Sequence, residues 1–203
     1  MLANALPTTL ESLSAAPDDG ELGWMWRAQR GDVQATPMVV VPTGVEAAFY
    51  QLNNLPERLR RVFDGVDLND PDEDDLEELA PEAEALVRAH VLESEVIERL
   101  YELMAPLAER LVLRRSGGAG VEVQRGRPAL LAMKRLWSDD WRAEALDRRL
   151  RGGLGLAPAA APLALHDADL APVSDAAASF GGEVERAWRD RAGRLARVVL
   201  RTP

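Results

Sequence analysis

The spacing of hydrophobic residues predicts a chain dominated by helices. The clearest pattern starts near Pro81, where apolar residues return every three or four positions over roughly thirty residues. Such a helix would be about 45 Å long. Pro106 is expected to kink it or to mark its last turns, because proline lacks a backbone N–H. The positions that define this long central helix are Leu86, Val87, His90, Val91, Ile97, Leu100, Met104, Leu107 and Leu111.

Shorter helices are predicted on both sides of the long one. Thr43 and Glu46 have the spacing of a capping box, so a helix is expected to begin there. Further helices are expected from Pro128 and from Ser138, since proline suits a first helical turn and serine is a favourable N-cap. The glycines at 152–153 would end the last of these helices.

Only two stretches favour β-structure. Residues 38–41 are mostly β-branched and lie between two prolines, which predicts one short strand. Residues 111–115 and 121–125 alternate around a glycine-rich turn, a pattern typical of a β-hairpin. The alternative for 111–115 is the end of the long helix followed by a loop. Both interpretations stay open at the level of sequence.

The fold class expected from these patterns is mainly α. Residues 1–151 are predicted to form an irregular helical domain, with the hairpin as its one possible small sheet. Residues 152–182 are rich in Gly, Ala and Pro and are expected to be a linker packed on the surface. Residues 183–203 are expected to form a C-terminal amphipathic helix, with apolar positions opposite several arginines.

The charge of the chain is concentrated in one region. The 203 residues carry 34 acids and 24 Lys or Arg residues, for a net charge of −10. Residues 57–110 hold 17 of the acids and 6 of the bases, or −11, so the rest of the chain sums to +1. This balance argues against a uniformly basic nucleic-acid coat. It leaves room for a local basic surface at 111–151 or 183–203.

The acids are densest between residues 64 and 78, where nine of fifteen positions are Asp or Glu. Asp72 and Asp74 fit the register of an EF-hand loop that begins at Asp70, but the glycine and the final glutamate of that motif are missing. We therefore expect a solvated loop leading into the long helix, or a docking patch for a basic partner in which Asp72, Asp74 and Asp75 take part.

Cysteine is absent, which excludes disulfides, thiol nucleophiles and cysteine-bound metal centres. The first residues do not form a secretory signal, and no uncharged apolar run approaches eighteen residues. The sequence therefore predicts a cytoplasmic protein without a membrane span.

Two pairs of acids are each spaced by one helical turn. Glu95 with Glu98 and Glu144 with Asp147 would place two carboxylates on one helix face. If the two helices packed side by side, the four groups could hold Mg²⁺ against a nucleotide phosphate. The pattern is similar to the paired helical acid motifs of the all-α NTP pyrophosphohydrolases of the MazG type. The resemblance implies a Mg²⁺-dependent nucleotide hydrolase, but it covers only these two motifs, and the 45 residues between them exceed the spacing expected of that family.

Tryptophan and arginine are grouped near the middle and the end of the chain. Trp137 and Trp141 are one turn apart and close to Arg142, while Trp188 lies among the arginines of the last segment. Aromatic rings beside arginines can stack on unpaired bases, although burial in a core is the commoner use of tryptophan. These four residues are candidate partner-binding positions.

The function expected from sequence is a non-enzymatic protein–protein interaction or assembly protein, with no cofactor, whose partner is another protein or a second copy of itself. The first alternative is the Mg²⁺-dependent hydrolase. The second is a nucleic-acid-associated protein, or an acidic decoy of a nucleic-acid enzyme.

Overall fold

The fold mixes helices with two antiparallel sheets. The computed structural model describes residues 6–158 and 161–201 and has 44% helix and 20% strand, so the prediction of a mainly α fold is wrong. The larger sheet has five strands in the order β1-β2-β5-β3-β4. Their bounds are β1 Thr8–Thr9, β2 Val39–Val41, β3 Arg110–Arg115, β4 Gly120–Gln124 and β5 Leu163–Asp167.

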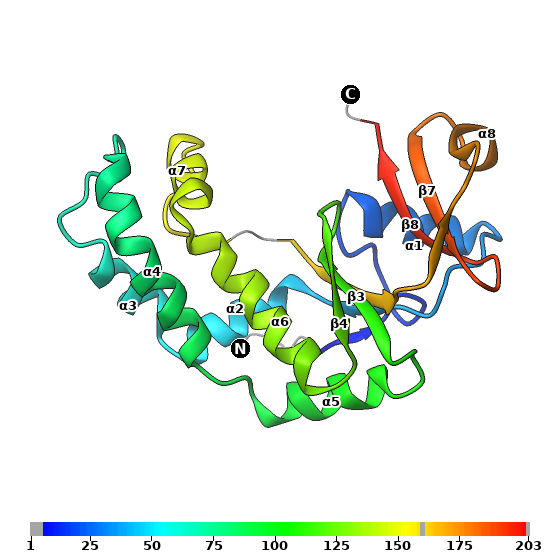
Figure 1. Cartoon of the computed structure of the whole chain (residues 1–203), viewed down its shortest axis with the longest axis horizontal. Helices are drawn as coiled ribbons and strands as arrows, with labels where there is room; N and C mark the ends of the chain where they lie inside the picture. The colour runs from blue at the N-terminus through cyan, green and yellow to red at the C-terminus, as the bar shows by residue number, and fades with distance from the viewer. Residues whose placement is uncertain (1–5, 159–160, 202–203) are drawn as a thin grey trace.

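Helices cover one side of the large sheet and extend beyond it into a helical lobe (Figure 1). In this lobe α4 lies against α6 and α7, and α3 lies against α4. The elements on this side are α2 Thr43–Leu52, α3 Leu55–Val62, α4 Glu73–Ala89, α5 Ser94–Met104, α6 Arg127–Ser138, the 3₁₀ turn η1 Asp139–Trp141 and α7 Ala143–Arg151. No helix within the described ranges is long and apolar enough to cross a membrane.

The small sheet lies at the other end of the molecule, with strand order β6-β7-β8 (Figure 1). It packs with α1 against the second face of the large sheet. The central strands β2 and β5 of the large sheet are therefore buried on both faces, which is why Val39, Val40 and Val41 are all buried in succession. The bounds at this end are α1 Glu21–Arg30, β6 Leu170–Pro172, α8 Ala176–Phe180, β7 Val184–Asp190 and β8 Leu195–Leu200.

The predicted long helix is two helices with a break between them. α4 begins at Glu73, eight residues before Pro81, with Asp72 as its N-cap. The acids of its first turn favour this start because they face the positive end of the helix dipole. α4 ends at Ala89, its C-cap His90 has an extended backbone with ψ 156°, and α5 starts at Ser94. The chain then enters β3, so the hairpin interpretation of 111–125 is the correct one.

The predicted linker contains a central strand. β5 pairs with β2 on one side and with β3 on the other, so the sheet crosses the expected boundary at residue 151. Leu163, Ala164 and Leu165 are buried there. The low charge that suggested a surface linker instead reflects a strand covered on both faces.

The predicted C-terminal helix is a β-hairpin made of β7 and β8. The chain reverses at Gly193, whose φ of +80° suits glycine, and the Asp190 side chain accepts N–H bonds from Ala192 and Arg194, both of 2.9 Å. Register shifts interrupt the alternation of apolar residues along β7. These irregularities made the strand pattern look helical, because they move apolar residues off a strict period of two.

Candidate functional site

Several of the exposed acids of the acidic segment lie along one helix, α4. Asp72 accepts an N–H bond of 3.0 Å from Asp74 and caps α4, so its role is structural as well as electrostatic. Asp74 and Asp75 are exposed. Together with their exposed acidic neighbours on α4 they form what we call the acidic α4 surface, for which no ion pair occurs within residues 6–158 and 161–201. This surface consists of Glu73, Asp74, Asp75, Glu77, Glu78 and Glu82.

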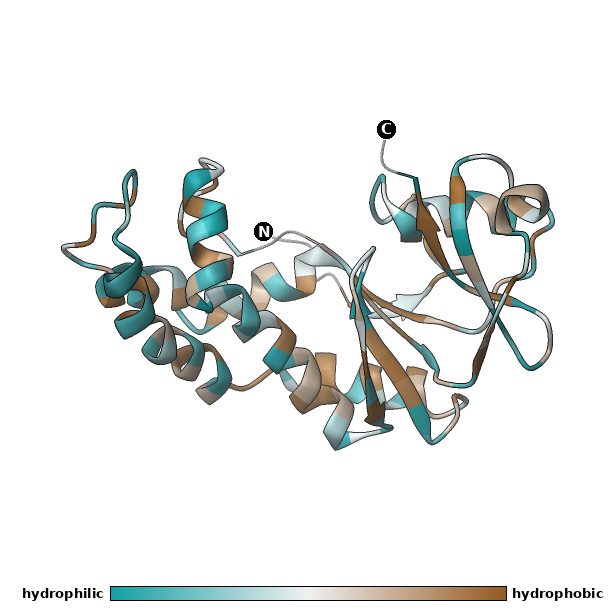
Figure 2. Ribbon diagram, turned by 45° about the horizontal axis from the view of Figure 1, so that its top comes forward, coloured by the Kyte–Doolittle hydropathy of each residue, from teal (hydrophilic) through white to brown (hydrophobic). Residues whose placement is uncertain are grey.

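A groove of about 440 Å³ runs between α4 and α7 beside this surface. Glu73 and Glu77 line it from α4, and Glu144 and Asp147 line it from α7. Arg148 and Arg151 also line the groove, and Arg151 forms an ion pair of 2.7 Å with Asp147. The walls therefore keep an excess of carboxylates over arginines. In Figure 2 the helices of the lobe alternate between hydrophilic and hydrophobic stretches, as expected of helices with one exposed side.

The four carboxylates of the hydrolase alternative do not meet. Glu95 and Glu98 lie on α5, below the large sheet in Figure 1, whereas Glu144 and Asp147 lie on α7 in the helical lobe. In the described part of the chain, no group of three or more His, Asp or Glu side chains is placed to hold a metal ion. The convergence that this alternative requires is therefore not found.

Trp137 and Trp141 are core residues and do not form a partner-binding surface. Both are 0% exposed. Trp141 donates a 2.7 Å hydrogen bond from its indole N–H to the hydroxyl of Tyr50 and stacks on Phe63, with ring centroids 6.2 Å apart. Arg142 is exposed, but it forms an ion pair of 2.7 Å with Asp139.

Trp188 is the candidate tryptophan that reaches the surface. It is half-buried on β7, opposite Arg197 on β8 and two residues from Arg186. The guanidinium carbons lie 5.0 Å (Arg197) and 5.8 Å (Arg186) from the centre of its ring. Since alternate residues of a strand share one side, these three side chains form an Arg/Trp face on the outside of the small sheet. Arg197 is half-buried in this face and donates a 3.1 Å hydrogen bond to the carbonyl of Gly118.

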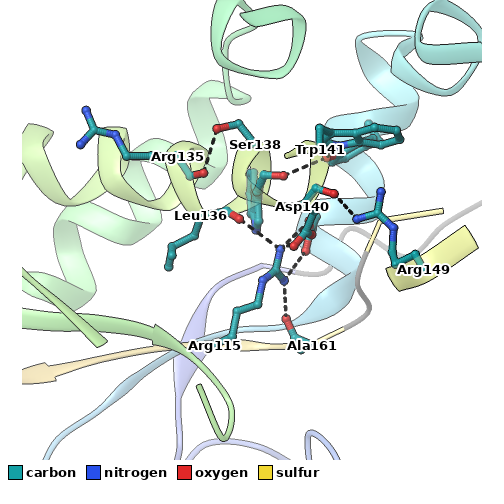
Figure 3. A network of polar contacts seen from close by, with 11 residues as sticks. Arg115, Arg135, Leu136, Ser138, Asp140, Trp141, Arg149 and Ala161 are labelled. Carbon is teal, nitrogen blue, oxygen red and sulfur yellow. Dashed lines mark hydrogen bonds and ion pairs between the residues drawn. The ribbon is translucent and has the colours of Figure 1, made fainter. Parts of the chain in front are cut away.

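A buried polar network joins the helical lobe to the large sheet at the end of β3 (Figure 3). Arg115 binds both carboxylate oxygens of Glu46, at 3.1 and 3.3 Å, and one oxygen of Asp140 at 2.6 Å. Arg115 also donates a 3.2 Å hydrogen bond to the carbonyl of Ala161. Arg149 donates to the carbonyl of Asp140. The elements α2, β3, η1 and α7, and the segment that leads into β5, are thus held together by the Arg115 guanidinium and its neighbours.

Glu46 was expected to close a capping box at the start of α2, but its side chain belongs to this network. The N-cap of α2 is Pro42, and no side chain caps the helix. The pKa of Glu46 is raised to about 7. Burial is the main cause and the Asp140 carboxylate adds to it, while the charge and hydrogen bond of Arg115 lower the pKa. The carboxyl is only 4% exposed and bound by Arg115, so we interpret it as a structural contact between lobe and sheet.

The raised pKa of Glu46 predicts a pH-dependent stability. Between the ordinary value of 4.5 and about 7, the folded chain binds more protons at this site than the unfolded chain. The contribution of Glu46 is therefore fully favourable below pH 4.5 and is lost as pH rises through about 7. We expect the free energy of unfolding of Glu46→Gln, relative to that of the wild type, to rise by up to about 3 kcal/mol across this window, on top of a pH-independent cost of weakening the contact with Arg115. Urea unfolding at several pH values measures this change.

The difference in free energy of unfolding between variant and wild type separates the pH dependence due to Glu46 from the opposite pH dependence due to His166. Burial lowers the pKa of His166 to about 4, so its contribution is lost as pH falls from 6.5 through about 4 in both proteins. Glu57→Gln, at a surface ion pair, serves as control and should change the free energy of unfolding by less than about 1 kcal/mol. A Glu46→Gln difference that does not vary with pH would contradict the prediction.

A second buried cluster lies on the other side of β3. Arg114 is 0% exposed and forms an ion pair with Glu21. Its Nε donates a 3.2 Å hydrogen bond to Nε2 of His166. Glu21 also accepts backbone N–H bonds from Gly117 at 2.9 Å and from Val198 at 3.0 Å. His166 is neutral there, since burial and the Arg114 charge both lower its pKa. The cluster ties α1, β3, β5 and β8 together.

Neither buried cluster was found from the sequence. The one available signal was the pair Arg114-Arg115 at the end of an alternating apolar run. Neighbouring residues on a strand face opposite sides, so these two arginines would point to opposite faces of the sheet. Two adjacent arginines on a strand buried on both faces each require a carboxylate partner. The partners are 69 and 93 residues away along the chain, so the sequence did not identify them.

Comparison with models of known protein families gives no match to this chain, and comparison with curated protein sequences gives none at a significant level. Function has therefore to be inferred from the chain's own surfaces and buried groups.

Proposed function

We propose that this protein is a non-enzymatic interaction or assembly protein that binds a basic segment of a protein partner through the acidic α4 surface. The observation that carries the proposal is a set of exposed carboxylates without an ion pair in the described part of the chain, beside a groove that carboxylates also line.

These acids are not explained by folding alone. Those in the first turn of α4 stabilise the helix through its dipole, but Glu77, Glu78 and Glu82 lie beyond that turn. Asp74 and Glu78 are four residues apart on one helix face, where like charges repel. A basic partner would remove this repulsion on binding, and the negative field would also speed its approach.

The Arg/Trp face provides a second surface of opposite charge at the far end of the molecule (Figure 1). A half-buried tryptophan flanked by arginines is typical of the residues that contribute most at protein interfaces. The arrangement supports a bivalent assembly role, with a basic segment bound at α4 and an acidic one at β7 and β8.

The experiment compares two triple variants of equal charge change. Asp74→Asn, Asp75→Asn and Glu78→Gln together neutralise part of the acidic α4 surface, whereas Glu95→Gln, Glu98→Gln and Glu109→Gln neutralise three exposed acids elsewhere. Each protein is immobilised and exposed to native lysate. We expect the wild type and the second variant to retain a basic protein, and the first variant to lose about tenfold or more in affinity.

Binding should also weaken as salt rises from about 0.05 to 0.5 M, because exposed charges are screened. Equal retention by the two variants would contradict the proposal, and so would the absence of any specific partner. Capture of a nucleic-acid enzyme whose retention is competed by nucleic acid would instead favour the acidic-decoy alternative.

A further inference from the structure

Strand β4 has a free edge whose polar backbone groups can be assigned residue by residue. The backbone N–H of Ala168, next to β5, donates to Arg110 at 3.1 Å, so the even-numbered residues of β3 bond toward β5. The N–H of Arg125 donates to Glu109 at 2.8 Å, so the odd-numbered ones bond toward β4. This alternation is a property of antiparallel ladders.

The register then fixes which groups of β4 point outward. Leu111 pairs with Val123 and Leu113 with Val121, so both valines bond inward to β3. The N–H and C=O groups of Gly120, Glu122 and Gln124 therefore point away from the sheet, and no hydrogen bond to them occurs in residues 6–158 and 161–201. All three residues are exposed.

The other sheet edges in the described chain are blocked or very short. On β8, Leu195 exchanges backbone bonds of 2.8 Å with Gln34 and Thr36, and Val198 donates to Glu21. β6 has three residues and ends in Pro172, and β1 has two residues. β4 has neither proline nor lysine nor a covering segment, which are the usual protections of an edge strand.

We infer that β4 is a homodimer interface, at which β4 of a second copy pairs antiparallel to it and continues the large sheet across a twofold axis. This inference rests on the proposed assembly function and names a second copy of the chain as one partner. That copy binds at β4, not at the acidic α4 surface. Of the registers that bring outward groups opposite each other, one places Glu122 opposite Glu122, which like-charge repulsion disfavours. Another places Gly120 opposite Glu122, where glycine has no side chain to form a cross-strand pair.

The favoured register places Glu122 of one copy opposite Gln124 of the other, with Val123 on the twofold axis. Each Glu122–Gln124 pair exchanges two backbone hydrogen bonds, and symmetry creates the pair twice. Glu122, which lies 3.6 Å from the guanidinium of Arg110 on its own β3, then faces a neutral amide that can donate to it. The side chain of Val121, 43% exposed in the single chain, becomes covered on the same side of the sheet as Leu113.

The test measures the mass of the full-length chain by light scattering over a concentration series. The wild type should reach twice the chain mass. Glu122→Pro should be a monomer, because it removes an outward N–H and leaves the β3–β4 ladder intact. Glu122→Gln keeps that N–H and should remain a dimer. Circular dichroism and urea unfolding check that each variant is folded.

A second pair of variants tests the register. Gln124→Glu places two carboxylates opposite each other at both pairs and should raise the dissociation constant roughly two- to thirtyfold. Adding Glu122→Lys to it creates opposite charges in the same register and should restore the dimer.

A wild type that stays monomeric up to about 100 μM would overturn the inference while leaving capture of a basic partner at α4 intact. A dimer that survives Glu122→Pro would overturn it as well. Loss of the α4 partner in a chain that still dimerises through β4 would contradict only the proposed function.

Discussion

Replacing Arg114 with methionine is expected to lower the free energy of unfolding by about 3–5 kcal/mol, because the change leaves the Glu21 carboxylate buried without its positive partner. Glu21 is 3% exposed and would keep only its backbone bonds from Gly117 and Val198. Methionine preserves much of the length of the arginine stem, so lost packing contributes less than lost charge. Urea unfolding at pH 7 measures the effect.

The matched control is Arg110→Met on the same strand. Arg110 is exposed and pairs at 3.0 Å with Asp169 and at 3.6 Å with Glu122, surface contacts worth at most about 1 kcal/mol each. Adding Glu21→Gln to Arg114→Met should recover part of the loss, since the buried charge is then gone. A loss for Arg114→Met no larger than that for Arg110→Met would show that the pair does not stabilise the fold as inferred.

Trp141→Ala is expected to destabilise the chain by about 3–5 kcal/mol, the usual cost of removing a large buried aromatic ring. The substitution empties the space between Phe63 and Tyr50 and removes the indole donor to the Tyr50 hydroxyl. Urea unfolding followed by far-UV circular dichroism checks it, because that signal does not depend on the tryptophan removed.

Trp188→Ala gives the comparison for this prediction. Its ring is half-buried on the outside of the small sheet, so we expect a smaller loss of stability than at Trp141. Unchanged stability of Trp141→Ala would support the original interpretation of that residue as a partner-binding position, and would contradict its place in the core.

Several elements were predictable because their signals are local. The helix beginning at Pro128 exists as α6, and the short strand at 38–41 exists as β2. The hairpin of β3 and β4 follows from alternation and a glycine-rich turn. The acidic surface was also visible in advance, because exposed charge depends little on what a helix packs against.

The candidate site was predictable only for residues at the surface. Asp72, Asp74, Asp75 and Trp188 lie where a partner can reach them at least in part, and Trp137 and Trp141 do not. Two tryptophans one helical turn apart lie on the same side of a helix, and their spacing alone does not tell whether that side is buried or exposed. The choice between these depends on which neighbours cover the rings, and those neighbours come from α2 and α3.

The sequence by itself determined the segregation of charge, the β3–β4 hairpin and individual helices such as α6, because these depend on neighbouring residues. Only the tertiary structure decided that 163–167 is a central strand, that 184–200 is a hairpin, and that Arg114 and Arg115 bind carboxylates on opposite sides of one strand. Each of these depends on a partner far away in the chain. A buried strand without strict alternation gives no local signal of the strand it pairs with. An arginine without a nearby acid likewise gives no local signal of the carboxylate it binds, so only the folded chain reveals both partners.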